Sequence, residues 1–198
     1  MKRIHSITAG LRLAAVAWFL GIVAMQGWAQ QPQTDADAEY ATELLKPGQQ
    51  IPDFQLKTPQ GKTVSLSELT EGCYVVLDFW ASWCPDCRRD MPNVQRMYEE
   101  FSQKGVTFVG ISFDTEPKAW QAAIDKYNIR YAQVSDLKKM RESDVAKAFG
   151  VKWIPSMILV DPQGKVVLST VLSEKMERRS QKRWPTRRKT KELQRDKR

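Results

Sequence analysis

Continuous hydrophobic runs alternate along the chain with segments in which hydrophobic residues recur at helical spacing. The runs YVVLDFW, residues 74–80, and VTFVGISF, residues 106–113, are rich in β-branched and aromatic residues. Such runs are typical of central strands that are buried on both faces. Residues 84–105, which lie between them, carry hydrophobic residues at i, i+3, i+4 and i+7: Val94, Met97, Tyr98 and Phe101. We therefore expect a helix here, kinked at Pro92 and ended by Gly105.

The alternation continues downstream of the second run. Residues 116–129 place a proline in the first turn and predict a second helix. Residues 132–137 predict a short extended piece, and residues 143–151 predict a third helix with Ser143 or Asp144 as its cap. Residues 153–172 predict two strands joined by a Pro-Gln-Gly turn. Strands that alternate with helices before a closing hairpin indicate an α/β sheet, parallel in the middle and antiparallel at one edge.

Two weaker strand signals precede the first hydrophobic run. Residues 48–56 (GQQIPDFQL) contain Pro52, which a sheet tolerates only at its edge, and so predict a short edge strand. Residues 63–69 (TVSLSEL) predict either a short strand or a helical turn, with Gly61 in the turn before them.

The N-terminus has the pattern of an export signal. Lys2, Arg3 and Arg12 are followed by an apolar run, residues 13–25, and then by the small residues Gly27 and Ala29. We therefore expect residues 1–29 to be a cleaved signal peptide and the mature protein to be periplasmic. The alternative is an uncleaved membrane anchor, although a membrane span needs roughly 20 apolar residues. An exported protein meets an oxidising compartment, in which disulfide chemistry is available.

The charge of the chain is concentrated at its C-terminal end. The formal net charge is +8, and residues 174–198 hold 12 of the 31 Lys and Arg residues but only 4 of the 23 Asp and Glu residues. The rest of the chain is therefore neutral, which argues against a nucleic-acid-binding fold. We expect a linker over residues 30–46, one folded domain over 47–173, and a solvated, disordered basic tail over 174–198, because that segment shows no hydrophobic stripe.

The stretch WASWCPDC holds two of the three cysteines of the chain, Cys84 and Cys87. A closed zinc site needs four ligands, and after signal cleavage the chain would offer three cysteines and no histidine. A structural staple is also a poor fit, since closing so short a loop removes little chain entropy. A pair at the junction of a buried strand and a helix favours reactivity instead, because the helix N-terminus stabilises a thiolate.

The order of motifs in this chain resembles that of the thioredoxin superfamily, and most closely the exported TlpA/ResA-like thiol-disulfide oxidoreductases. The resemblance covers roughly residues 47–168 and rests on the Pro-Asp-Phe segment, Trp-Cys-x-x-Cys, Gly-Ile-Ser-x-Asp, Ile-Pro-Ser and Asp-Pro-x-Gly. It implies a thioredoxin-like three-layer α/β sandwich with an N-terminal β-hairpin and a central α/β insertion. It also implies a protein-disulfide reductase that needs no cofactor beyond its redox-active Cys84–Cys87 disulfide.

The resemblance also implies roles for individual residues. Cys84 resembles the attacking nucleophile and Cys87 the resolving thiol. Pro155 matches the family's cis-proline, and the backbone of Ile154 before it would bind an extended segment of a partner. Trp83 resembles the ring that flanks the site.

Two carboxylates are candidates for tuning the pair. Asp78 occupies the position of the family's buried acid, whose pKa burial should raise, so that it could exchange a proton with Cys87. The alternative is a structural carboxylate, and the lysine with which thioredoxins pair this acid on the next strand is missing from VTFVGISF. Asp90 takes the place of a family glutamate; it either tunes Cys87 or is a solvated helix carboxylate.

The dipeptide between the cysteines, Pro85-Asp86, bears on the direction of electron flow. The negative charge of Asp86 opposes ionisation of Cys84, and this stabilises the disulfide relative to the dithiol. We therefore expect a reductant or a mid-potential exchanger.

The third cysteine, Cys73, lies outside the motif and is expected to be a packing residue, with an extra redox role as the alternative.

Two other functions compete with thiol-disulfide exchange. A peroxiredoxin-like peroxidase would carry Pro-x-x-x-Thr-x-x-Cys, and the corresponding positions are Leu77 and Ala81. A non-enzymatic module would use the dithiol to hold a metal or a partner.

The expected partners are protein thiols and disulfides, such as apocytochrome thiols in cytochrome c maturation, with a membrane electron donor as a further candidate and no nucleic acid. We expect a monomer.

Overall fold

A computed structural model describes residues 35–70 and 72–184, and its core is one seven-stranded sheet in the order β2-β1-β5-β4-β3-β6-β7. The central strands are β3 (Tyr74–Trp80), β4 (Val106–Ser112) and β5 (Ala132–Ser135), which are parallel to one another. Strands β6 (Ser156–Val160) and β7 (Val166–Thr170) complete one side as an antiparallel hairpin. On the other side, β1 (Gln55–Lys57) pairs antiparallel with both β5 and β2 (Thr63–Ser65).

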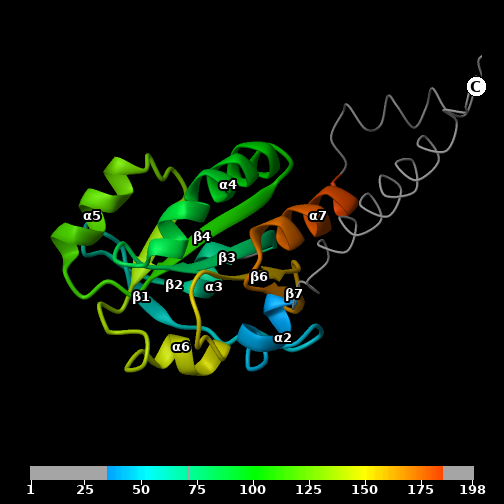
Figure 1. Ribbon diagram of the computed structural model, residues 1–198, viewed down its shortest axis with the longest axis horizontal. Coiled ribbons are helices and arrows are strands. Elements are labelled where there is room, and N and C mark those ends of the chain that lie inside the picture. The colour runs from blue at the N-terminus through cyan, green and yellow to red at the C-terminus, as the bar shows by residue number, and fades with distance from the viewer. Residues whose placement is uncertain (1–34, 71, 185–198) are drawn as a thin grey trace, which may run out of the picture. The chain divides into compact units, whose positions relative to one another are not determined.

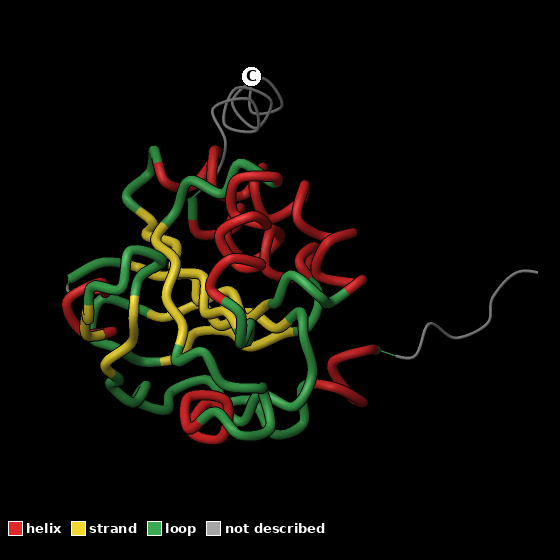
Figure 2. The backbone as a smooth tube through the Cα atoms, turned by 90° about the vertical axis from the view of Figure 1, so that its left-hand side faces the viewer, coloured by secondary structure: helices red, strands yellow, loops and turns green. Residues whose placement is uncertain are grey.

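Helices cover both faces of this sheet (Figures 1 and 2). One face carries α4 (Pro85–Ser102), α5 (Pro117–Lys126) and α7 (Ser173–Arg183), and the other carries α3 (Leu66–Thr70) and α6 (Asp144–Phe149). Strands β3 and β4 are buried along nearly their whole length because helices cover them on both sides. The fold is therefore the three-layer thioredoxin-like α/β sandwich that the resemblance implied, with the hairpin β1–β2 and the inserted α5 and β5.

Local sequence explains most of these boundaries. Ser143 caps the N-terminus of helix α6, where its side chain accepts the backbone N–H of Ala146, and Gly150 caps the C-terminus in the left-handed conformation. A side chain at Gly150 would also collide with the backbone of Glu43, so this glycine permits a close approach of the N-terminal segment. Helix α4 continues through Pro92, and residues 63–70 form both a short strand and a helical turn.

The prediction of an edge strand around Pro52 was wrong in position. Strand β1 begins only at Gln55, and it lies between β2 and β5, so β2 is the edge of the sheet. Pro52 precedes the paired residues and removes no hydrogen bond from the ladder. Gln50 forms an isolated bridge with Lys165 instead.

The predicted linker is wrong for its described part, residues 35–46. This segment contains helix α2 (Ala36–Tyr40), and it packs on the domain through Leu44, which is fully buried. The backbone N–H of Leu45 donates to Phe149 at 3.1 Å, and the Asp37 carboxylate accepts the hydroxyl of Thr170 and the N–H of Val171. A carboxylate and backbone groups make many of the contacts of this segment, and such contacts leave no hydrophobic periodicity in the sequence. The predicted signal peptide lies outside the described residues.

The predicted disordered tail is also wrong for residues 174–184, most of which form α7. The helix packs through Ser173, Met176 and Ser180, which are buried, and Trp184 after it contacts the rings of Tyr74 and Phe101. Two of the three inward-facing residues are serines, so the sequence of this segment shows no hydrophobic stripe that would predict a packed helix. The remainder of the predicted tail, residues 185–198, lies outside the described residues.

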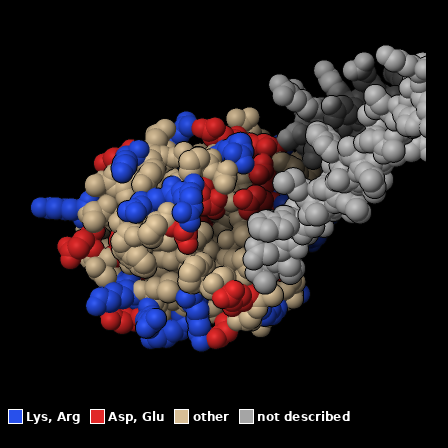
Figure 3. Space-filling view, viewed as in Figure 1, with Lys and Arg blue, Asp and Glu red and all other residues tan. Residues whose placement is uncertain are grey.

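The face of the domain shown in Figure 3 carries Lys and Arg side chains intermixed with Asp and Glu. Ion pairs at the surface of the domain include Arg96 with Glu177 and Arg130 with Glu99. Within residues 35–70 and 72–184, no helix has the length and hydrophobicity that a membrane span requires.

Candidate active site

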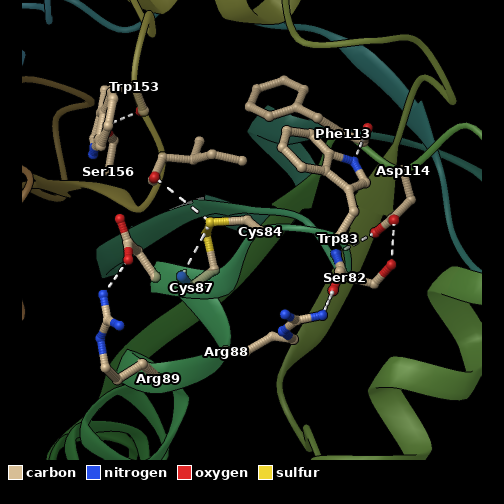
Figure 4. Close-up of a disulfide and its surroundings, with 12 residues drawn as sticks. Ser82, Trp83, Cys84, Cys87, Arg88, Arg89, Phe113, Asp114, Trp153 and Ser156 are labelled. Carbon is tan, nitrogen blue, oxygen red and sulfur yellow. Dashed lines mark hydrogen bonds and ion pairs between the residues drawn. A yellow bond between two sulfur atoms is a disulfide. The ribbon is translucent and has the colours of Figure 1, made fainter.

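The cysteine pair lies where the central strand β3 passes into helix α4 (Figure 4). Cys84 is the N-cap residue of α4, and its Sγ accepts the backbone N–H of Cys87 at 3.0 Å. The two cysteines form a disulfide with their Cα atoms 5.3 Å apart, and both are almost fully buried. Pro85 occupies the first turn of the helix, where its missing N–H costs no hydrogen bond. The fold thus places Cys84 where the backbone dipoles of a long helix favour negative charge.

The loop that contains Pro155 lies against the cysteine pair. The Ile154–Pro155 peptide bond is cis, and the carbonyl oxygen of Ile154 lies 3.6 Å from the Sγ of Cys84. The preceding residue, Trp153, is 38% exposed, and its ring packs on that of Tyr40 from α2 with the ring centroids 4.2 Å apart. The loop therefore presents a backbone carbonyl and an aromatic surface directly beside the reactive sulfur.

The loop before the cysteines is held by Asp114, a residue to which sequence reasoning gave no role of its own. Both oxygens of this buried carboxylate are used: Ser82 donates its backbone N–H at 2.9 Å and its hydroxyl at 2.6 Å. Ser112 also donates its hydroxyl to the carboxylate at 2.7 Å. The motif Gly-Ile-Ser-x-Asp contained this residue, and the serine two positions before it was the available signal. The contact fixes the loop that aims Cys84.

Trp83 lies on the solvent side of this loop and is 54% exposed. Its indole N–H donates to the carbonyl of Phe113 at 3.4 Å, which orients the ring beside the disulfide (Figure 4). Trp83 and Trp153 are the two large hydrophobic residues that are exposed in the described part of the chain. They lie on either side of the cysteine pair in Figure 4, so an exposed aromatic ring flanks the site on each side.

Asp78 lies in the middle of β3 and is 1% exposed. Burial raises the pKa of this carboxyl to about 7, against the lowering effect of a 2.8 Å hydrogen bond from the Tyr131 hydroxyl, and the charge of Asp90 raises the pKa further. A carboxyl whose pKa lies near neutral pH can both accept and release a proton under physiological conditions. Tyr131 was not identified from the sequence.

Asp90 is partly buried on α4 and makes two hydrogen bonds. Its Oδ1 accepts the hydroxyl of Ser173 at 2.6 Å and the side-chain amide of Asn93 at 2.8 Å. Asp90 therefore joins α4 to the start of α7, and its charge acts on Asp78. Of the two alternatives for Asp90, a freely solvated helix carboxylate does not agree with these hydrogen bonds.

Asp86 is paired with Arg89, one turn further along α4 (Figure 4). Both side chains are substantially exposed, so the pairing is weak and screened by solvent. From the sequence, Asp86 is expected to act on Cys84 as an unpaired charge. The adjacent guanidinium offsets part of that charge, and the effect of Asp86 on Cys84 is correspondingly smaller.

A cavity of about 440 Å³ lies between α4, the Pro155 loop, α2 and the start of α7. Its aromatic and apolar lining includes Tyr40, Trp153 and Pro155, and its acidic lining includes Asp86, Asp90 and Glu174. Arg89 and Asn93 also line it. The cavity thus adjoins the cysteine pair and combines aromatic contacts with a surplus of negative charge.

Cys73 lies outside this arrangement, at the start of β3. It is a partly buried free thiol that packs against the hydrophobic core. In the described part of the chain, no group of three or more His, Cys, Asp and Glu side chains is placed to hold a metal ion.

Comparison with known proteins assigns this chain to a family. Residues 47–169 match the model of the AhpC/TSA family. The chain is 31% identical over 124 residues to the thiol-disulfide oxidoreductase ResA of Halalkalibacterium halodurans, which covers 63% of this chain and 68% of that protein. Among solved structures, a thiol:disulfide interchange protein from Bacteroides sp. is similar with a TM-score of 0.63 and 32% identity, over 70% of this chain and 90% of that one.

A thiol-disulfide oxidoreductase from Bacteroides fragilis is similarly related, with a TM-score of 0.59 and 29% identity over 66% of this chain and 98% of that one. The family match, residues 47–169, includes the strand, the cysteine pair and the cis-proline loop that form the site. The chain therefore belongs to the AhpC/TSA family of the thioredoxin superfamily, and it is a thiol-disulfide oxidoreductase.

Proposed function

We propose that this protein reduces disulfide bonds in exported proteins, with Cys84 as the attacking nucleophile and Cys87 as the resolving thiol. The observation that carries the proposal is the position of Cys84 at the N-cap of α4. There its sulfur accepts the Cys87 N–H at 3.0 Å, an interaction that favours the thiolate over the thiol.

The reaction transfers two electrons from the dithiol to the substrate disulfide. The Cys84 thiolate attacks one substrate sulfur, a mixed disulfide forms, and the other substrate sulfur leaves as a thiolate and takes up a proton. Cys87 then loses its proton and attacks the sulfur of Cys84. The mixed disulfide breaks, the second substrate thiol is released, and the Cys84–Cys87 disulfide remains.

Asp78 is the group that we assign to the second step. Cys87 must lose a proton in a site from which water is largely excluded, so a buried acceptor is needed. The pKa of Asp78, which burial raises to about 7, matches this task. Returning the proton to the leaving thiolate would reset Asp78 for the next cycle.

The substrate would bind along the Pro155 loop. The backbone of Ile154, next to Cys84, supports the binding of an extended segment by main-chain hydrogen bonds. The exposed rings of Trp83 and Trp153 flank this position, and the acidic cavity beside it would favour partners with a basic residue near the reactive cysteine. The oxidised cysteine pair of an apocytochrome that awaits haem attachment is one candidate substrate, and a membrane protein that delivers electrons would bind the same face.

The proposed direction of electron flow, from this protein to its substrates, rests on the negative charge of Asp86. The ion pair with Arg89 offsets part of that charge. Asp86→Asn should make the reduction potential less negative, because it removes a charge that opposes the Cys84 thiolate. Arg89→Ala should make it more negative, because it frees that charge. For an exposed pair the two shifts should be on the order of 10 mV and opposite in sign. Equilibration with glutathione measures both, and shifts of the same sign would contradict the assignment.

The test of the proposed function is to trap substrates on Cys84. Cys87→Ser should accumulate mixed disulfides with exported proteins, because the attacking sulfur remains and the resolving one is gone. Cys84→Ser should trap none, and Cys73→Ser should behave like the unmodified chain and serves as the matched control. Trapping by Cys84→Ser, or insulin reduction that survives this substitution, would show that exchange does not proceed through Cys84.

A further inference from the structure

The buried carboxylate of Asp78 has a single hydrogen-bond donor among the described side chains, the hydroxyl of Tyr131 at 2.8 Å. We propose that Tyr131 is a positioning residue for thiol-disulfide exchange: its hydroxyl holds one oxygen of Asp78, so that the other oxygen stays free to take the proton of Cys87. This inference rests on the function proposed above and adds to it a residue from the inserted part of the fold.

The sheet brings Tyr131 to Asp78 from two strands away. Tyr131 immediately precedes β5, and it lies on the same face as Gln133 because side chains alternate along a strand. In the registers of the sheet, Asp78 on β3 pairs with Gly110 on β4, and Gly110 pairs with Gln133 on β5. Asp78, Gly110 and Gln133 therefore form one row across the sheet.

Gly110, in the middle of that row, has no side chain and leaves space above β4. A side chain at Gly110 would collide with the amide of Gln133, which lies over the glycine. Gln133 reaches across β4 in this way and accepts the indole N–H of Trp80 on β3 at 2.9 Å. The glycine thus lets Gln133 contact β3 directly. Tyr131, two residues earlier, also reaches β3, where its hydroxyl donates to Asp78 at 2.8 Å.

Packing fixes the Tyr131 ring. Its centroid lies 5.4 Å from that of Tyr98 on α4 and 5.9 Å from that of Phe108 on β4. The hydroxyl lies 4.0 Å from the sulfur of Met91, which follows Cys87 by one turn of α4. The hydroxyl is therefore held between the carboxylate and the helical turn that carries the resolving cysteine.

The electrostatics of this arrangement agree with a fixed donor. Burial and the neighbouring Asp78 raise the pKa of Tyr131 well above its usual range, so the phenol keeps its proton at every physiological pH. Three influences on the pKa of Asp78 are resolved: burial raises it, the Tyr131 hydrogen bond lowers it, and the charge of Asp90 on α4 raises it. Tyr131 thus supplies the stabilisation of the carboxylate for which VTFVGISF offers no lysine.

The proton balance of the step is simple. Cys87 gives its proton to the free oxygen of Asp78 and attacks the Cys84 sulfur, while the bond between Cys84 and the substrate breaks. Asp78 then returns the proton to the departing thiolate. Tyr131 keeps its own proton throughout and is neither acid nor base in the step.

The deciding variant is Tyr131→Phe, which keeps the ring and removes only the hydroxyl. Without that hydrogen bond, the pKa of Asp78 should rise by about one to two pH units. Single-turnover reduction of an oxidised peptide, followed by tryptophan fluorescence across pH, should show the same upward shift. The rate near pH 6.5 should fall on the order of tenfold and recover at pH 9. Carboxyl carbon NMR of Asp78 measures the shift directly.

Two further variants separate positioning from a structural effect. Tyr98→Phe removes a neighbouring hydroxyl, whose contact is a 3.4 Å bond to the exposed carbonyl of Arg130, and it should leave the pH profile unchanged. In an Asp78→Asn background, Tyr131→Phe should produce no further shift, because the acceptor of the proton is already gone.

An equal loss of rate at every pH in Tyr131→Phe, or an unchanged titration of Asp78, would overturn the inference. Failure of the proposed function is distinguishable from this result. In that case the unmodified chain would not reduce the peptide through Cys84, whereas the titration of Asp78 would still report whether Tyr131 controls the carboxyl.

Discussion

Asp78→Asn is expected to stabilise the folded protein at alkaline pH while it impairs turnover. The pKa of Asp78 is raised by burial from 3.8 to about 7. Between these pH values the folded protein binds a proton that the unfolded chain has already released. The free energy of unfolding therefore falls as the pH rises through this window, by about 4 kcal/mol at most once both states are ionised.

Asparagine carries no such charge, and its side-chain oxygen can still accept the hydroxyl of Tyr131. Urea denaturation of the oxidised protein at pH 5 and pH 8.5 measures the effect without interference from the two active-site thiols. The unmodified chain should lose stability between these pH values, and the variant should lose markedly less. Equal losses in the two proteins would mean that Asp78 is ionised in the folded state throughout this range.

The same substitution should slow exchange by roughly a hundredfold at pH 7, because Cys87 loses its buried proton acceptor. The remaining pH dependence should report the ionisation of Cys84 alone. An opposite effect on stability and on activity from one substitution is the pattern expected of a residue retained for chemistry rather than for folding.

The second large effect is expected at Met176 in α7. This side chain is fully buried, and Met176→Ala should lower the free energy of unfolding by roughly 2–5 kcal/mol through lost burial and a residual cavity. Thermal and urea denaturation measure the loss. Arg178→Ala, on the exposed side of the same helix, is the matched control and should change stability by less than about 0.5 kcal/mol.

Equal, small effects of the two α7 substitutions would mean that the helix does not form part of the fold. The result matters for function as well, because Ser173 at the start of α7 donates to Asp90 and lines the acidic cavity. Loss of α7 should therefore weaken the binding of a basic peptide in addition to lowering stability.

The sequence alone determined the parts of this protein that depend on neighbouring residues. Strands β3 and β4 follow from uninterrupted hydrophobic runs, α4 from its periodicity, and the position of Cys84 at the helix N-terminus from its place between a strand and a helix. The ordered motifs around them indicated the thioredoxin-like fold. They also predicted that Pro155 lies beside the cysteine pair, although the proline is far from the cysteines in the chain.

Only the tertiary structure decided the contacts that join distant segments. Helices α2 and α7 attach through an aspartate, serines and one methionine, residues that the sequence pattern assigns to solvent. Asp114 fixes the loop at Ser82, which lies 32 residues away in the chain. Tyr131 meets Asp78 because the strand order places β5 only two strands from β3. Local patterns carry the spacing of residues along an element, but the order of strands in a sheet sets which side chains share a buried site.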